Sequence, residues 1–169
     1  MMMRMLQAGG MPVVTDAARA ADDHNPHGYF EDERVRSLAR EAAWVEQARG
    51  KAIKVIYRLL PYLPAQLEYR VIYMQRDYLE IYDSQQAMLL SRGDAAAAQD
   101  RHSTLTALAR DENRILGWLR EQPNFRYLAV TYTTAAAAVP EIARFLERDL
   151  NQAAMIAAVD PALYRHRHL

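Results

Sequence analysis

Apolar residues recur at helical spacing in several stretches of the chain. In the segment 31–48 they fall at Val35, Leu38, Ala42 and Val45, behind a run of acidic residues of the kind that the helix dipole favours at a helix start. This pattern predicts one helix, ended by the glycine that follows. The same spacing predicts helices over 79–93, 98–121, 139–150 and from 151 onward, and a brief helical turn over 58–64.

Three short apolar runs, rich in β-branched and aromatic residues, lie between these helices. They read KAIKVIY (51–57), YRVIYMQ (69–75) and NFRYLAVTY (124–132), and each predicts a strand with a buried middle. Because strands alternate with helices, we predict an α/β domain with a mostly parallel sheet flanked by helices. Ligands of such sheets bind beyond the carboxyl ends of the strands.

The chain opens with an apolar segment, MMMRMLQAGG, that predicts a short helix. Gly9 and Gly10 end this helix, and Pro12 prevents its continuation. So short a helix is unstable alone in water, because nucleation costs more than its few hydrogen bonds return. We therefore expect the segment either to pack inside the domain or to be the second half of an element that begins upstream.

Composition favours a single globular domain over residues 1–169. Of these residues 51% are hydrophobic and 25% charged, which allows a substantial core. Lys and Arg number 21, as do Asp and Glu, so no net charge attracts the chain to nucleic acid or to an acidic membrane. The lack of cysteine excludes disulfides, thiol nucleophiles and cysteine-bound metals. No apolar run approaches the ~18 residues of a membrane span, so we expect a cytoplasmic protein.

One candidate site follows the second predicted strand. Arg76 stands where this strand leaves the sheet, and Ser84 lies eight positions later on the next predicted helix. An arginine at a strand tip and a hydroxyl about two turns into the helix can converge on one anionic group. The alternative is an ordinary ion pair of Arg76 with Asp77 or Glu80, and a solvated Ser84.

This stretch resembles the 3′-phosphate-binding segment of P-loop sulfotransferases. In that family an apolar strand is followed by Arg-Asp or Arg-Asn and by a serine eight residues after the arginine, which Arg76, Asp77 and Ser84 match. The chain is also similar to bacterial sulfotransferase-like proteins over most of its length, at NPHGYFEDERV (25–35), RGKAIKVI (49–56), VTY (130–132) and DPALYRHR (160–167).

The resemblance implies a three-layer fold of the P-loop NTPase and sulfotransferase type, with 3′-phosphoadenylyl sulfate (PAPS) as the sulfuryl donor. Arg76 and Ser84 would hold the 3′-phosphate of this donor. The family's fold begins with a strand and a glycine-rich loop of the type G-x-P-R-S-G-T-S, which binds the 5′-phosphosulfate and runs into a helix. MMMRMLQAGG resembles the remainder of that helix, and the loop itself is not in this sequence. We therefore expect the fold to be incomplete at its N-terminus, either because Met1 is assigned too late or because the domain itself lacks this element.

The candidate catalytic residues depart from the pattern of the family. Well-known family members carry a histidine two residues after a lysine at the end of a strand, where this chain has Lys54, Val55 and Ile56. Lys54 can polarise an oxygen of the sulfuryl donor, or it can be a strand residue whose ammonium reaches solvent. His27, like His24, lies in a polar loop and can serve as a displaced base or bind an anion.

Other polar residues have simpler interpretations. Glu31, Asp32 and Glu33 are first-turn partners of a helix dipole, with a general-base role as the lesser alternative. His166 and His168 belong to a basic tail rather than to a metal site, so we expect no metal.

We therefore expect a domain that resembles enzymes transferring a sulfuryl group from PAPS to an alcohol or amine, impaired by the absent loop. Its partners would be a nucleotide and an unknown acceptor, without nucleic acid or membrane. The alternative is a non-catalytic domain of the same fold that binds a nucleotide or another protein, and an exposed sheet edge would favour a homo-oligomer. A nucleotide kinase-like protein fits less well, because neither a phosphate loop nor an acidic magnesium-binding strand end is evident.

Overall fold

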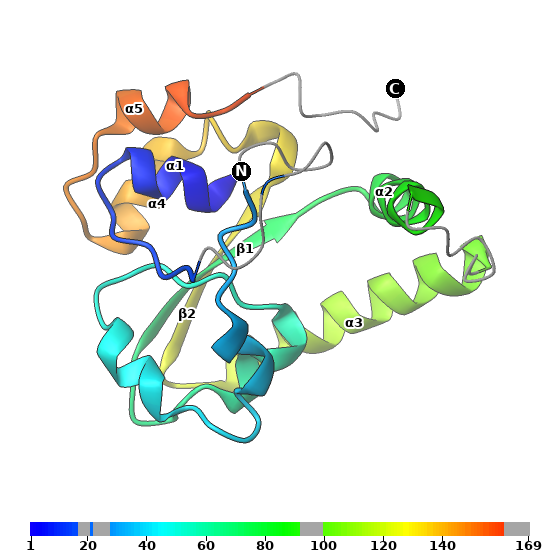
Figure 1. Cartoon of the computed structure of the whole chain (residues 1–169), viewed down its shortest axis with the longest axis horizontal. Helices are drawn as coiled ribbons and strands as arrows, with labels where there is room; N and C mark the ends of the chain where they lie inside the picture. The colour runs from blue at the N-terminus through cyan, green and yellow to red at the C-terminus, as the bar shows by residue number, and fades with distance from the viewer. Residues whose placement is uncertain (17–20, 22–27, 92–99, 161–169) are drawn as a thin grey trace.

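The described residues form a mixed α/β structure around a small parallel sheet (Figure 1). The computed structural model describes residues 1–16, 21, 28–91 and 100–160. Its α-helices are α1 (Met2–Ala8), α2 (Tyr78–Ser91), α3 (Arg101–Glu121), α4 (Val139–Leu146) and α5 (Gln152–Ala157). Its 3₁₀ helices are η1 (Glu33–Ser37), η2 (Ala43–Ala48), η3 (Tyr57–Tyr62) and η5 (Tyr132–Thr134), and its strands are β1 (Tyr69–Gln75) and β2 (Phe125–Thr131).

The two strands pair in parallel, from Tyr69 opposite Phe125 to Gln75 opposite Thr131. The chain passes from β1 to β2 through α2 and α3, since parallel strands need a long crossover connection. Both strands, their direction and the two intervening helices agree with the sequence prediction. Within the described ranges the sheet has these two strands, fewer than the three that were predicted.

The predicted strand over 51–57 is wrong. Throughout this segment only Ala52 makes a strand-type contact, an isolated parallel bridge to Val13. The following residues join no strand, and the chain turns into η3 at Tyr57. Ile56, which a buried strand would cover, is 58% exposed. An apolar run forms a strand only where another backbone is placed to pair with it, and that placement is a tertiary property.

The single helix predicted over 31–48 is replaced by η1 and η2. Ala42 separates them with φ −120° and ψ −1°, outside the helical region. Val35 and Trp44 are nevertheless both buried in the same core. In one continuous α-helix these two side chains, about two and a half turns apart, would lie on opposite faces. Breaking the helix therefore brings both side chains into the core.

Two hydrophobic clusters pack against the sheet. The methionine cluster consists of Met2, Met5, Leu6, Ala52, Val130, Ala135, Val139, Ile142, Leu146, Leu150 and Met155. The aromatic cluster consists of Val35, Leu38, Trp44, Val45, Ala48, Leu60, Leu63, Leu67, Ile115, Leu119 and Phe125. In β1, Ile72 and Met74 contact the methionine cluster, whereas Val71 and Tyr73 contact the aromatic cluster. Because successive side chains of a strand point to opposite faces, the two clusters cover the two faces of the sheet.

The predicted opening helix is confirmed as α1, and it packs inside the structure. Figure 1 shows α1 grouped with α4 and α5. Met5 is completely buried in the methionine cluster. At the end of α1, the carbonyl oxygen of Gly9 accepts a hydrogen bond from the backbone N–H of Asn151 at 3.0 Å. These contacts supply the support that so short a helix needs.

Candidate functional site at the carboxyl end of the sheet

Arg76 immediately follows β1, and Tyr132 immediately follows β2. Because Gln75 pairs with Thr131 in parallel register, the next residue of each strand extends beyond the same edge of the sheet. The guanidinium carbon of Arg76 lies 5.3 Å from the centre of the Tyr132 ring, within the range of a cation–π contact. The structure therefore places Arg76 at the carboxyl edge, where the sequence predicted it.

Arg76 forms an ion pair with Glu80. Its Nε donates to Oε2 of Glu80 at 3.0 Å, and this carboxylate is only 3% exposed while the arginine side chain is 23% exposed. Asp77 instead caps α2, because its Oδ1 accepts a hydrogen bond from the backbone N–H of Leu79 at 2.8 Å. Of the ion pairs considered from the sequence, the one with Glu80 forms, and it is buried rather than solvated.

Ser84 lies on α2, one turn after Glu80. Residues four positions apart lie on the same face of a helix, so Ser84 shares one face of α2 with Glu80, the ion-pair partner of Arg76. Ser84 is half-buried. Ser84 thus lies one helical turn beyond the ion pair of Arg76 and Glu80.

Lys54 belongs to a different group of contacts. Its Nζ donates to the carbonyl oxygen of Tyr29 at 3.1 Å and to Oε1 of Glu31 at 3.0 Å. Burial lowers the pKa of the Met1 amino group, and the nearby positive charges of Lys54 and Arg4 lower it further. The ammonium of Lys54 therefore faces a carboxylate near the start of α1, and its side chain remains 41% exposed.

Glu31 is the functional candidate whose contacts the sequence analysis missed. It precedes η1, so it is not a first-turn residue, and its carboxylate pairs with Lys54 across 23 positions of sequence. No local pattern in the sequence indicates the pair of Glu31 and Lys54, because the two residues are so far apart in the chain.

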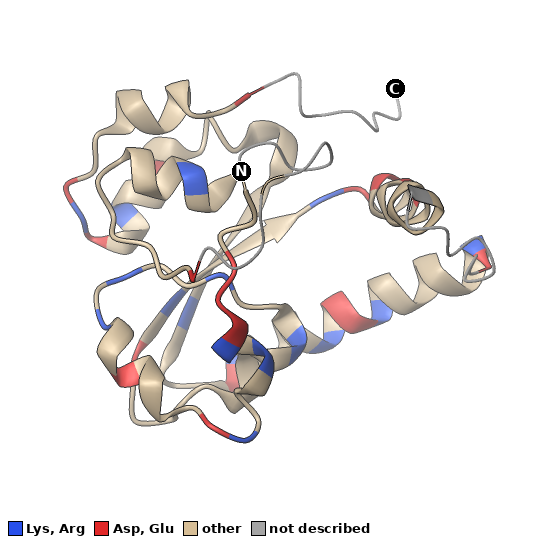
Figure 2. Ribbon diagram, viewed as in Figure 1, with Lys and Arg blue, Asp and Glu red and all other residues tan. Residues whose placement is uncertain are grey.

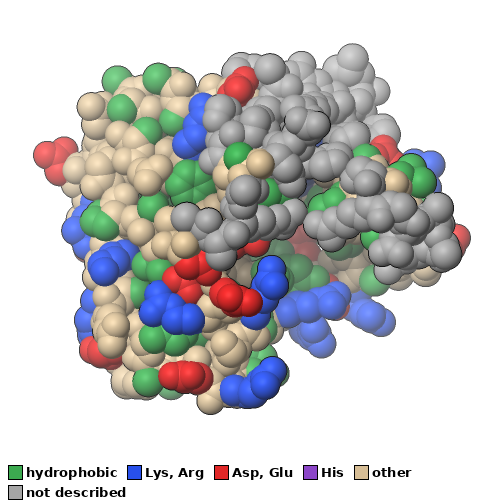
Figure 3. Space-filling model, in the orientation of Figure 1, with side chains coloured by type: hydrophobic (Ala, Val, Ile, Leu, Met, Phe, Trp, Pro, Cys, Tyr) green, Lys and Arg blue, Asp and Glu red, His purple; other side chains and the backbone are tan. Residues whose placement is uncertain are grey.

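Asp32 is the N-cap of η1 and also binds Arg34 through two hydrogen bonds, of 2.9 and 2.7 Å, which hold the pKa of the Asp32 carboxyl below its usual value. Figure 3 shows acidic and basic side chains gathered side by side on this face of the molecule.

His27, the other predicted catalytic residue, lies outside the described residues, as do His24, His166 and His168. A role of His27 in catalysis stays a prediction.

A polar cluster connects the carboxyl edge to α3. Glu112 accepts a hydrogen bond from Nε2 of Gln75 at 2.8 Å, and its other carboxylate oxygen accepts one from the hydroxyl of Tyr78. The hydrogen bond to the carboxylate, followed by burial, raises the pKa of Tyr78 to about 12. This cluster fixes the start of α2 and the middle of α3 relative to the end of β1.

No family model, curated protein or solved structure matches the chain. Among the described residues, no helix is both long and apolar enough to cross a membrane. A search of the same residues finds no group of three or more His, Cys, Asp or Glu that could hold a metal ion. The assignment of a function must therefore rest on the geometry of the carboxyl edge and on the sequence resemblance.

Proposed function

We propose that the carboxyl edge of the sheet binds the 3′-phosphate of an adenine nucleotide, and that the chain is a sulfotransferase-like domain of the three-layer P-loop type. The observation that carries the proposal is the position of Arg76, whose guanidinium follows the tip of β1 and contacts both the ring of Tyr132 and the carboxylate of Glu80. Both contacts fix the orientation of the guanidinium before a ligand arrives, which lowers the entropic cost of binding.

Two features support the assignment of an anionic ligand. A guanidinium matches the oxygens of a phosphate through paired N–H donors. Ser84 offers a hydroxyl one turn beyond Glu80 on α2, at the spacing from Arg76 that the sulfotransferase family uses for the 3′-phosphate. The sequence contains no glycine-rich loop for the 5′-phosphosulfate, so we assign to this chain the 3′-phosphate alone.

If transfer takes place, Lys54 and Glu31 have complementary roles. The oxygen of an acceptor alcohol, or the nitrogen of an acceptor amine, attacks sulfur as the bond from sulfur to the phosphate oxygen breaks, and adenosine 3′,5′-bisphosphate leaves. Lys54 stabilises the negative charge that develops on the donor oxygens. The proton of the acceptor alcohol or amine passes to a base, and Glu31, 3.0 Å from Lys54, is one candidate beside His27.

Isothermal titration calorimetry with adenosine 3′,5′-bisphosphate and with adenosine 5′-monophosphate tests the proposal, because only the first nucleotide carries the 3′-phosphate. We expect the bisphosphate to bind more tightly. The substitution Arg76→Ala should weaken its binding at least about tenfold, which is ~1.4 kcal/mol. Ser84→Ala should have a smaller effect in the same direction.

Two controls make the result interpretable. Arg126→Ala removes an arginine at the amino end of β2 that is 64% exposed, and should leave the affinity unchanged. Because Arg76→Ala leaves a buried carboxylate unpaired, the double variant Arg76→Gln, Glu80→Gln replaces the ion pair by neutral groups. Unchanged affinity in a folded Arg76 variant would remove the site. Binding without sulfuryl transfer from PAPS would identify a non-catalytic nucleotide-binding domain.

A further inference from the structure

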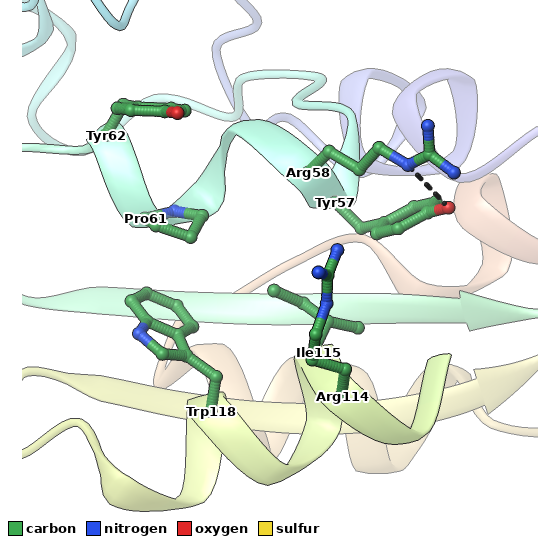
Figure 4. A pocket seen from close by; sticks show the side chains of 7 residues that line it. All are labelled: Tyr57, Arg58, Pro61, Tyr62, Arg114, Ile115 and Trp118. Atoms are coloured by element: carbon green, nitrogen blue, oxygen red, sulfur yellow. Dashed lines mark hydrogen bonds between the residues drawn. The ribbon is translucent and has the colours of Figure 1, made fainter. Parts of the chain in front are cut away.

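A cavity lies between η3 and the C-terminal half of α3, with a volume of about 350 Å³. Seven residues line it: Tyr57, Arg58, Pro61, Tyr62, Arg114, Ile115 and Trp118. Figure 4 shows that these side chains are segregated. The rings of Pro61, Tyr62 and Trp118 lie at one end, and Tyr57, Arg58 and Arg114 lie at the other. The cavity therefore has an aromatic end and a basic end.

The aromatic end offers ring surface to a ligand. Tyr62 is 50% exposed, so part of its ring surface is open to solvent. The position of Trp118 is held by Phe125, because the two rings meet edge-on with their centres 5.1 Å apart. A ring that enters this end can therefore stack on Trp118, which the aromatic cluster already holds in place.

The basic end consists of two guanidinium groups that share one carboxylate. Nη2 of Arg58 donates to Oδ2 of Asp111, and Nη2 of Arg114 lies 3.7 Å from Oδ1 of the same residue. The hydroxyl of Tyr57 also donates to Asp111, at 3.1 Å, and accepts from Nε of Arg58 at 3.1 Å. The Asp111 side chain is 8% exposed, whereas those of Arg58 and Arg114 are 62% and 73% exposed. The carboxylate thus faces inward, and one net positive charge faces solvent.

We propose that this cavity binds a small aromatic anion, a planar ring system that bears one carboxylate or sulfonate. The ring would stack between Tyr62, Pro61 and Trp118, and the anionic group would pair with Arg58 and Arg114. The cavity volume lies near the lower end of the range of about 300–1,000 Å³ for small-molecule sites, which suits one or two fused rings. The lining includes neither Arg76, Ser84 nor Lys54, so this inference does not depend on the proposed nucleotide site.

Two-dimensional ¹H–¹⁵N NMR of the whole chain tests the inference, because the sequence has two tryptophans and therefore two indole N–H signals. The probes are 2-naphthoate and 2-naphthalenemethanol, which share a ring system but differ in charge. We expect 2-naphthoate to shift the signal of Trp118 saturably while that of the buried Trp44 stays in place. The neutral alcohol should bind at least about fivefold more weakly. Trp118→Phe assigns the signals.

The matched variants are Arg114→Gln and Arg101→Gln. Both replace an exposed arginine of α3, but Arg101 lies at the other end of the helix, about 20 Å away at 1.5 Å per residue. Arg114→Gln should weaken 2-naphthoate binding about three- to fivefold and leave the alcohol unaffected, and Arg101→Gln should change neither. An unshifted Trp44 signal shows that each variant is folded. Equal affinity for the two probes, no shift at Trp118, or an unchanged affinity in Arg114→Gln would overturn the proposal.

Discussion

The two faces of the sheet are packed in different ways. Four of the five largest side chains that are completely buried among the described residues belong to the methionine cluster: Met5, Met155, Ile142 and Val139. The aromatic cluster contributes only Leu119 to this group. Its periphery instead contains ion pairs, ring contacts and the cavity between η3 and α3.

The two faces of the sheet also differ in the number of charged residues that cover them. Figure 2 shows few charged residues on α1, α4 and α5 and many along α3. The buried carboxylate of Asp111 belongs to α3, and that of Asp32 caps η1, next to the aromatic cluster. The comparison teaches that one face of the sheet serves mainly to hold the fold together, while the other leaves ring surface and guanidinium groups exposed to solvent.

The largest effect is expected from truncation of the aromatic cluster at its centre. Phe125 stacks on Tyr69 with the ring centres 4.6 Å apart and meets Trp118 edge-on. Phe125→Ala should therefore lower the free energy of unfolding by about 3–5 kcal/mol, measured by urea denaturation. Ile142→Ala, the matched change in the methionine cluster, should cost about 2–5 kcal/mol. A cost below about 1 kcal/mol for Phe125→Ala would mean that the aromatic face is not a packed core.

A smaller loss of stability is expected where α1 meets α5. A β-carbon added at Gly9 would lie 2.7 Å from Cγ of Met155, closer than atoms can approach. Gly9→Ala should therefore lower the free energy of unfolding by about 1–3 kcal/mol through overpacking. The double variant Gly9→Ala, Met155→Ala would relieve the clash, so its effect should be less than the sum of the two single effects.

The matched substitution on the other face of the sheet is expected to raise the free energy of unfolding rather than to lower it. Gly117 lies inside α3, and a β-carbon added there meets no atom within 4 Å. Gly117→Ala should raise the free energy of unfolding by about 0.5–1 kcal/mol, because alanine loses less backbone entropy than glycine in a helix. A loss of stability in Gly117→Ala, measured in the same denaturation assay, would show that α3 is as tightly packed as α1.

The smallest effect concerns pH. The hydrogen bond from Arg58 holds the pKa of the Asp111 carboxyl below its usual value. A group whose pKa is lower in the folded chain stabilises it fully above the unfolded pKa, about 3.9 for aspartate, and this contribution is lost as the pH falls through the folded pKa. Asp111→Asn should thus lower the Tm at pH 7 slightly and make the fall in Tm below about pH 4 shallower. Asp32 and Glu147, whose pKa values are also lowered, keep part of that fall in both proteins. An identical decrease in Tm in both proteins would contradict the prediction.

The local sequence pattern was sufficient to predict an element where the element is apolar on one face or is buried on both faces. The apolar run at 69–75 predicts a strand with the observed bounds, and the run at 124–132 differs from β2 by one residue at each end. The glycines at positions 9 and 10 correctly end α1. The placement of Arg76 at the carboxyl edge follows from the end of β1 alone. In each case the signal is carried by neighbouring residues, whose geometry the backbone period fixes.

Local pattern failed where distant segments decide the conformation. The segment 31–48 breaks into η1 and η2 because both halves must reach one core. The segment 51–57 lacks a strand because, among the described residues, its backbone pairs with another only at Ala52, which bridges to Val13. The partners of the candidate groups are likewise remote. Lys54 meets a carboxylate 23 positions away, and Arg58 meets one 53 positions away.

The amino-acid sequence by itself determined the two parallel strands, most of the α-helices and the residue that stands at the tip of β1. Only the tertiary structure decided which acids neutralise which bases, and that a cavity with an aromatic and a basic end opens between η3 and α3. The physical reason is range. Hydrophobic periodicity and helix ends act over a few neighbouring residues, whereas an ion pair or a cavity depends on which segments the completed core brings together.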